Sequence, residues 1–276
     1  MKGIKGRVAI ITGTASGIGA GLIKNFAASG AKLICVDIQG DGERFIDDFR
    51  DQATFLKADL RVDGDIAKIV DTAIRKFGQI DFLINCAATY VDKGASSTRS
   101  EWLNGFDSNL VGHVLLVQAA LPYLKKSSSP SIVNFSSESA HVGLAGRWIY
   151  PATKAAIEQV TRSQALDLAE FGIRSNSVMP GWTRKPFHDA APAEVAERYQ
   201  NLSSRLHMLR RMGTVDEVAQ AVLFLCSEHA SFITGSCMHV DGGHSALGPQ
   251  GLEVHLPTEI RKAAGVGSSA SGDRCP

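Results

Sequence analysis

Short apolar runs alternate with longer segments of helical periodicity through the first half of the chain. The runs have the length of strands, and the segments between them repeat apolar residues every three or four positions, as a helix with one buried face requires. The pattern predicts strands at 7–12, 32–37, 54–57, 80–85 and 131–135, and helices at 18–29, 41–50, 63–77 and 98–123. Gly30 and Gly78 are placed to end two of these helices, and Thr98 with Glu101 is typical of a capping box at the start of another.

The second half of the chain continues the same alternation. The expected elements are a helix at 150–171 that Gly172 ends, a strand at 173–178, an irregular and partly helical segment at 180–213, a helix at 214–227 and a last strand at 236–240. Thr214 and Glu217 form a second capping box. Strands that alternate with helices pair in parallel, and helices then cover both faces of the sheet. The expected fold is therefore α/β, with a doubly wound parallel sheet of about seven strands.

The sequence offers no point at which this pattern divides into two domains. It contains no linker and no internal repeat before residue 246, so we expect one domain over 1–246. The tail at 247–276 is rich in glycine and serine, and its end is expected to be disordered.

Composition excludes several classes of partner. The 276 residues include 29 Lys and Arg against 28 Asp and Glu, a net charge of +1, which argues against nucleic-acid or membrane-surface binding driven by bulk charge. No apolar run approaches the roughly 20 residues of a membrane span. The apolar run near the N-terminus is followed at once by glycine and serine, so we interpret it as a strand and not as a signal peptide.

The cysteines and histidines carry no metal or disulfide signature. The five cysteines are odd in number and form no C-x-x-C pair, which favours reduced thiols in a cytoplasmic protein. The eight histidines show no H-x-x-x-H pattern, so no metal site is predicted.

A glycine-rich turn joins the first strand to the first helix. It reads Thr-Gly-Thr-Ala-Ser-Gly-Ile-Gly over 12–19. At such a junction the backbone N–H groups and the helix N-terminus can face a phosphate, although a tight turn without a ligand is the alternative. The second strand ends at Asp37, where a carboxylate can accept hydrogen bonds from an adenosine ribose and would repel a 2′-phosphate. Because 12–19 contains no Lys or Arg, we predict NAD over NADP.

The spacing T-G-x-x-x-G-x-G resembles the short-chain dehydrogenase/reductase family, and further motifs of that family follow in order over roughly residues 4–246. These are Asp59-Leu60, Asn85-Cys86-Ala87-Ala88, Ser137 thirteen residues before Tyr150, Tyr150-x-x-x-Lys154, Pro180-Gly181 and Asp241-Gly242-Gly243. The resemblance implies a Rossmann-type fold and an NAD-dependent oxidoreductase that interconverts a secondary alcohol and a ketone by hydride transfer.

The resemblance also implies roles for individual residues. Tyr150 would be the catalytic acid–base, and Lys154 would bind the nicotinamide ribose and lower the pKa of Tyr150. Ser137 would hold the substrate oxygen, with Ser136 or Ser139 as alternatives, and Asn109 would hold a water in a proton relay. The residues expected to bind the cofactor are Gly13, Ser16, Gly17, Ile18, Gly19, Asp37, Asp59, Leu60, Asn85, Ala87, Tyr150, Lys154, Pro180, Gly181 and Thr183.

The sequence departs from the family pattern at three positions. Cys86 replaces an asparagine, and Ala88 replaces a glycine. The family often places a threonine directly before the proline that follows Pro-Gly, where it holds the nicotinamide carboxamide. Lys185 occupies that position here, and Thr183 is the candidate to substitute for the threonine.

The substrate is expected to contact the variable segments 138–149 and 180–213. Arg147, three residues before Tyr150, is either a solvated surface charge or an anchor for a carboxylate, to which an arginine can donate two parallel hydrogen bonds. An arginine at this position is similar to members of the family that oxidise hydroxy acids or carboxylated cyclic diols, so we predict a substrate of that kind. Alternatives are a neutral alcohol, a sugar, a steroid or a 3-ketoacyl thioester, and an NAD-binding module without turnover. The family also implies a homotetramer that uses the helices 98–123 and 150–171 as one interface and the end near 236–243 as another.

Overall fold

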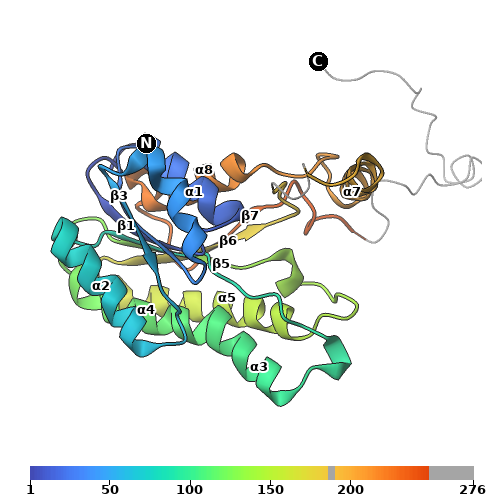
Figure 1. Cartoon of the computed structure of the whole chain (residues 1–276), viewed down its shortest axis with the longest axis horizontal. Coiled ribbons are helices and arrows are strands. Elements are labelled where there is room, and N and C mark those ends of the chain that lie inside the picture. Colours follow the sequence, from blue (N-terminus) through green and yellow to red (C-terminus); the bar gives the residue numbers. More distant parts are fainter. Residues whose placement is uncertain (186–189, 249–276) are drawn as a thin grey trace, which may run out of the picture.

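A seven-stranded, fully parallel sheet with helices on both faces forms the molecule (Figure 1). The computed structural model describes residues 1–185 and 190–248, so most of the predicted tail, with Cys275, lies outside the described residues. The strands are β1 (Val8–Thr12), β2 (Lys32–Asp37), β3 (Ala53–Lys57), β4 (Phe82–Asn85), β5 (Ser131–Phe135), β6 (Arg174–Pro180) and β7 (Cys237–Val240). Their order, β3-β2-β1-β4-β5-β6-β7, confirms the predicted doubly wound sheet.

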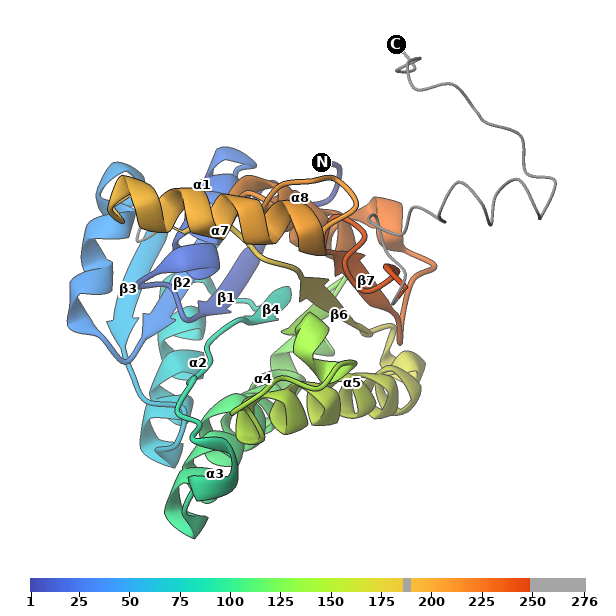
Figure 2. The same ribbon diagram turned by 90° about the vertical axis from the view of Figure 1, so that its right-hand side faces the viewer.

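Two helix layers enclose the sheet. The helices α1 (Gly17–Ala28) and α8 (Val215–Cys226) cover one face, and α2 (Asp63–Phe77), α4 (Gly112–Leu124) and α5 (Ile149–Leu168) cover the other, as Figures 1 and 2 show from two sides. The helix α7 (Ala193–Leu206) lies apart from these layers, on the right in Figure 1. The remaining short helical turns are Gly94–Ser96, Glu138–Ala140, Ala169–Phe171 and Glu228–Ala230.

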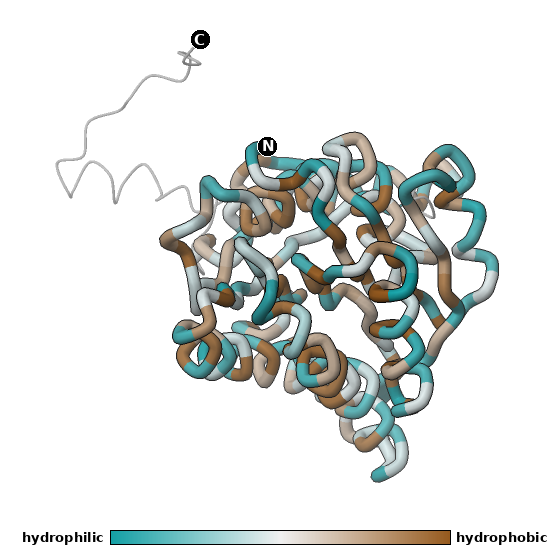
Figure 3. The backbone as a smooth tube through the Cα atoms, turned by 90° about the vertical axis from the view of Figure 1, so that its left-hand side faces the viewer, coloured by the Kyte–Doolittle hydropathy of each residue, from teal (hydrophilic) through white to brown (hydrophobic). Residues whose placement is uncertain are grey.

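Successive residues of each central strand enter opposite cores. Ile11 and Leu33 pack toward α1 and α8, whereas their neighbours Ile10 and Ile34 pack toward α2 and α4, and all four are fully buried. This alternation follows from the two-residue repeat of a strand. Both faces are therefore apolar, which explains why the strands are near-continuous hydrophobic runs. Figure 3 shows the hydrophilic positions gathered in the outer turns.

Several predicted helix ends are confirmed. Gly78 follows α2 in the left-handed region at φ 76°, and its N–H donates to the carbonyl of Ile74. Both capping boxes form, one before α8 and one before the short helix α3 (Arg99–Phe106). The predicted helix at 41–50 is wrong in type, because Gly40–Phe49 is a 3-10 helix, and the strand at 80–85 begins only at Phe82.

The long helix predicted at 98–123 is interrupted. A π-helical turn, Asp107–Val111, separates α3 from α4. Within it the side chain of Asn109 accepts a hydrogen bond from the N–H of Thr89 at 2.7 Å and donates to the carbonyl of Thr89 at 3.0 Å. Nδ2 also donates to the hydroxyl of Thr153 on α5 at 3.2 Å. The extra residue of a π-turn redirects the side chain, so these buried contacts account for the interruption.

Candidate active site

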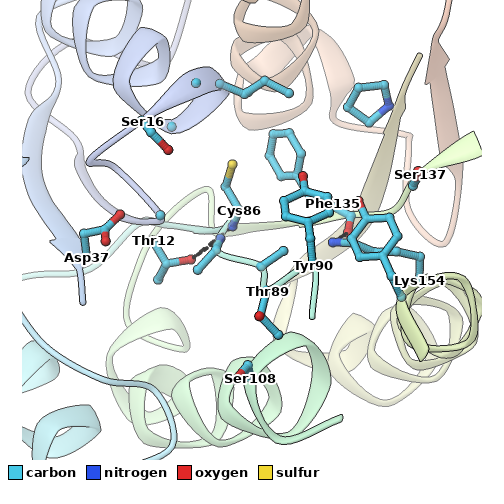
Figure 4. Close-up of a pocket in the computed structure, with 18 of the residues that line it drawn as sticks. Thr12, Ser16, Asp37, Cys86, Thr89, Tyr90, Ser108, Phe135, Ser137 and Lys154 are labelled. Atoms are coloured by element: carbon cyan, nitrogen blue, oxygen red, sulfur yellow. Dashed lines mark hydrogen bonds between the residues drawn. The ribbon is translucent and has the colours of Figure 1, made fainter. Parts of the chain in front are cut away.

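The carboxyl ends of the strands surround a cavity of about 630 Å³ (Figure 4). It lies where the strand order reverses between β1 and β4, the position at which doubly wound sheets bind ligands. Of the residues predicted for the site, those that line it are Gly13, Ser16, Gly17, Ile18, Gly19, Asp37, Asp59, Leu60, Ala87, Ser137, Tyr150, Lys154, Pro180, Gly181 and Thr183. Residues predicted to bind the cofactor and residues predicted to carry out the reaction, which are far apart in the sequence, thus line one cavity.

The glycine-rich loop is fixed by its contacts with the end of β4. The hydroxyl of Thr12 accepts hydrogen bonds from the N–H groups of Cys86 at 3.0 Å and of Ala87 at 3.1 Å. A Cβ at Gly13 would lie 2.7 Å from the Cα of Ala87, so only glycine fits there. Gly19 likewise has no room for a side chain against the carbonyl of Gly13. The resulting flat cradle leads into the N-terminus of α1 and fits a diphosphate.

Asp37, the last residue of β2, is held in place by backbone N–H groups beside the glycine-rich loop. Its carboxylate accepts hydrogen bonds from the N–H of Ala15 at 2.8 Å and from the N–H of Gln39 at 2.9 Å. Asp59, on the same side, pairs with Arg61 at 2.6 Å, and this contact lowers the pKa of Asp59. The cavity wall therefore carries two carboxylates that neighbouring groups hold in place.

Lys154 is almost fully buried beneath the other end of the cavity. Its ammonium donates a hydrogen bond to the carbonyl of Phe135 at 2.7 Å and lies 5.5 Å from the centre of the Tyr150 ring. Burial lowers the pKa of Lys154 to about 8. The four-residue spacing on α5 thus places the cation beside the phenol, as the sequence predicts.

Tyr150 lies at the first turn of α5, where its N–H donates to the carboxylate of Asp92 at 2.9 Å. Its ring stacks on Tyr90 with the ring centres 4.6 Å apart. Burial raises the pKa of Tyr150 well above its usual value, and Tyr90 adds to this effect, whereas a hydrogen bond with Ser137 opposes it. Within the chain, the environment of the phenol therefore favours its protonated form.

The serines after β5 have different partners. Ser137 contacts Tyr150 and also donates to the carboxylate of Glu138 at 3.1 Å. Ser136 instead donates to Glu158 on α5, which also contacts His141 at 3.0 Å. Of the alternatives that the sequence left open, Ser137 is thus the hydroxyl that the structure places beside Tyr150. Its catalytic role stays a prediction.

Three predicted residues are not among the described residues that line the cavity. Asn85 donates from its side chain to Asn134 at 2.8 Å inside the sheet, and Asn109 lies behind Thr89. Arg147 is exposed, and Nη1 donates to the backbone carbonyl of Tyr90 at 2.9 Å. This contact ties Arg147 to the loop that carries Tyr90.

Sequence reasoning missed the aromatic wall of the cavity. Tyr90 covers Tyr150, and Trp182 and Tyr199 also line the space, with their ring centres 6.2 Å apart. Tyr199 comes from α7, inside the segment expected to contact substrate. The only available signal was position, because Tyr90 follows β4 by five residues and Trp182 follows the Pro-Gly turn directly.

The comparison with known families agrees with this geometry. A family model described as enoyl-(acyl carrier protein) reductase matches residues 13–245. The chain belongs to the short-chain dehydrogenase/reductase family. It is an oxidoreductase of that family, and the ordered motifs of the sequence are explained by membership in it.

Characterised relatives span almost the whole domain. The chain is 33% identical over 246 residues to the cis-4-hydroxycyclohexanecarboxylate dehydrogenase of Sinomonas cyclohexanicum, with 87% of this chain and 97% of that protein covered. It is 36% identical over 248 residues to the 3-oxoacyl-[acyl-carrier-protein] reductase of Thermotoga maritima, with 87% and 98% covered. The ligand-free aldohexose dehydrogenase of Thermoplasma acidophilum is 31% identical, with a TM-score of 0.83 and 92% and 98% covered.

The structure also bears on the cysteines and on possible membrane spans. Cys35, Cys86, Cys226 and Cys237, the cysteines within the described residues, are all free thiols. No helix in the described part of the chain is both long and apolar enough to cross a membrane.

Proposed function

We propose that the protein oxidises a secondary alcohol to a ketone, and catalyses the reverse reduction, with NAD as cofactor. The observation that supports this most strongly is the grouping of Ser137, Tyr150 and Lys154 at one end of a cavity whose other end fits a dinucleotide. The complete set also argues against an NAD-binding module without turnover, since each group that the chemistry requires is present.

The chain's own residues would move the proton while the bound nicotinamide accepts or donates the hydride. Ser137 would hold the substrate oxygen by a hydrogen bond, and Tyr150 would take the proton from the alcohol. Because burial and Tyr90 favour the protonated phenol, oxidation needs a nearby positive charge, and Lys154 would supply it. Asn109 would order the loop that follows β4 through Thr89 and support proton exchange near Lys154.

The preference for NAD is carried by Asp37. Its fixed carboxylate at the end of β2 suits two ribose hydroxyls and disfavours a 2′-phosphate. Asp37→Ala is expected to raise the KM for NAD by about 10-fold or more and to reduce the ratio of activities with NAD and NADP. Steady-state kinetics with both cofactors measures this.

A second variant distinguishes the charge of Asp37 from its role in holding the glycine-rich loop. Asp37→Asn keeps an oxygen for the N–H of Ala15 but removes the negative charge. It should relax the bias against NADP with a smaller loss of NAD affinity. An unchanged cofactor ratio in both variants would show that Asp37 does not select the cofactor.

For the substrate, we propose a hydroxy acid or a cyclic alcohol bearing a carboxylate. Three observations support this choice. The aromatic wall of Tyr90, Trp182 and Tyr199 suits a ring, the cationic Arg147 is hydrogen-bonded to the backbone of Tyr90, and one relative is named for a hydroxycyclohexanecarboxylate. The test is NADH formation with matched acids, methyl esters, sugars, steroids and neutral cyclic alcohols. A preference for the neutral compounds would overturn the proposal.

Arg147→Ala distinguishes a substrate anchor from a loop support. If Arg147 binds a carboxylate, the variant should lower kcat/KM for the acid by about 10- to 150-fold and change the value for its methyl ester much less. Equal losses on the acid and the ester would assign Arg147 to holding Tyr90 through the contact seen here. Arg147→Lys is the control, because lysine keeps the positive charge but lacks the planar guanidinium that donates two parallel hydrogen bonds.

We also propose a cytoplasmic homotetramer. Exposed apolar side chains along the second helix layer support an interface there, among them Leu103 on α3, Val111 in the π-turn and Leu166 on α5, which is 79% exposed. Light scattering would test the assembly, and a mass near that of the 29.4 kDa chain would contradict it.

A further inference from the structure

Lys185 lines the cavity from the segment that follows β6, and its side chain is half-buried. Two residues earlier, Thr183 forms a bridge with Gly213 and donates its hydroxyl to the carbonyl of Gly181 at 3.2 Å. Lys185 therefore brings a cation to the part of the cavity that the glycine-rich loop lines.

Three contacts locate this side chain. A Cβ at Gly17 would lie 3.4 Å from Cδ and 3.6 Å from Cε of Lys185, so the aliphatic stem crosses the glycine-rich loop. The ammonium lies 5.5 Å from the centre of the Tyr90 ring. Lys185 also lines the cavity together with Cys86, which follows β4 directly.

Gly17 is the first residue of α1, where N–H groups without helical partners and the helix dipole favour an anion. The side chain of Lys185 crosses this point from the opposite wall of the cavity. An anion there would have backbone donors on one side and an ammonium on the other. Lys154, another cation that lines the cavity, lies at the end near Tyr150.

We propose that Lys185 binds the diphosphate of the nicotinamide cofactor by an ionic contact, and so closes the phosphate cradle from the side opposite α1. The inference rests on the proposed use of a dinucleotide. Because the proposed contact is ionic, the affinity for the cofactor should fall as the ionic strength rises.

The test measures binding without turnover, on the full chain. Lys185→Gln is expected to raise the Kd of both NADH and ADP-ribose by about 10- to 150-fold, while adenosine, measured by displacement of NADH, keeps its affinity. The Kd of NADH should also rise less with added salt in Lys185→Gln than in the wild type. Lys185→Arg should retain most of the affinity for ADP-ribose, and Lys185→Thr should behave like Lys185→Gln toward it.

Lys24→Gln is the matched control, because Lys24 is exposed on α1 and the variant loses the same charge. Thermal melting of each variant checks that the fold is retained. A Lys185→Gln variant that binds ADP-ribose normally but NADH weakly would overturn the proposal and assign Lys185 to the carboxamide. Unchanged affinity for both ligands would also overturn it. Because no turnover is measured, loss of ADP-ribose binding would still support the inference if every alcohol tested proved inactive.

Discussion

Replacing Tyr150 with phenylalanine is expected to lower kcat by at least about 100-fold and to leave NADH affinity close to that of the wild type. The phenol is the group that would exchange a proton with the substrate oxygen, and it contacts Ser137. Phenylalanine keeps the ring that stacks on Tyr90, so the wall of the cavity should persist. Stopped-flow or steady-state formation of NADH gives kcat, and fluorescence titration gives the affinity.

Tyr90→Phe is the matched control for this experiment. It removes a phenolic hydroxyl from the same stack, 4.6 Å away between ring centres, without removing the proposed acid–base group. Its cost should be far smaller, below about 10-fold in kcat. Because Tyr90 raises the pKa of Tyr150, the variant should also shift the pH dependence of oxidation to lower pH. If Tyr150→Phe retained more than about a tenth of the wild-type kcat, the acid–base assignment would be wrong.

The sequence was sufficient to predict the sheet, because both of its faces are buried. Each central strand is then a continuous apolar run, and such runs can be located to within one or two residues. β2 and β5 begin and end at the predicted positions, 32–37 and 131–135. The location of the site could be predicted for the same reason, since motifs at the carboxyl ends of parallel strands meet at one edge of the sheet.

What could not be predicted depends on contacts between distant residues. Local periodicity favours one long helix at 98–123, whereas in the structure a π-turn lies where Asn109 bonds to Thr89 in the loop after β4. The stacking of Tyr90 on Tyr150 joins residues 60 positions apart, and no pattern in the loop signals it. Arg147 illustrates the same limit, because nothing near it in the sequence indicates its hydrogen bond to the carbonyl of Tyr90.

These unpredicted contacts form one connected wall. Arg147 holds the backbone of Tyr90, Tyr90 stacks on Tyr150, and the ammonium of Lys185 lies 5.5 Å from the centre of the Tyr90 ring. The loop after β4 thus links the glycine-rich cradle to the reacting end of the cavity. A substitution at Tyr90 is therefore expected to affect both cofactor and substrate, whereas one at Tyr150 should affect turnover alone.

Lys154→Met is expected to combine a loss of catalysis with a loss of cofactor binding, in contrast to Tyr150→Phe. The side chain is similar in length but lacks the charge that lies 5.5 Å from the Tyr150 ring centre and the donor that binds the carbonyl of Phe135. We expect kcat/KM for alcohol oxidation to fall by about 100-fold or more at neutral pH, with weaker NADH binding as well.

The pH profile of Lys154→Met tests the reason for that loss. Oxidation needs the phenolate of Tyr150, so in the wild type the rate should rise as the phenol loses its proton. Removing a positive charge raises the pKa of a neighbouring phenol, so the rising limb should move to higher pH in the variant. Lys154→Arg, which keeps the charge, should leave the rising limb near its wild-type position even if its activity is low. A rising limb that stays in place in Lys154→Met would show that Lys154 binds the cofactor but does not assist ionisation of Tyr150.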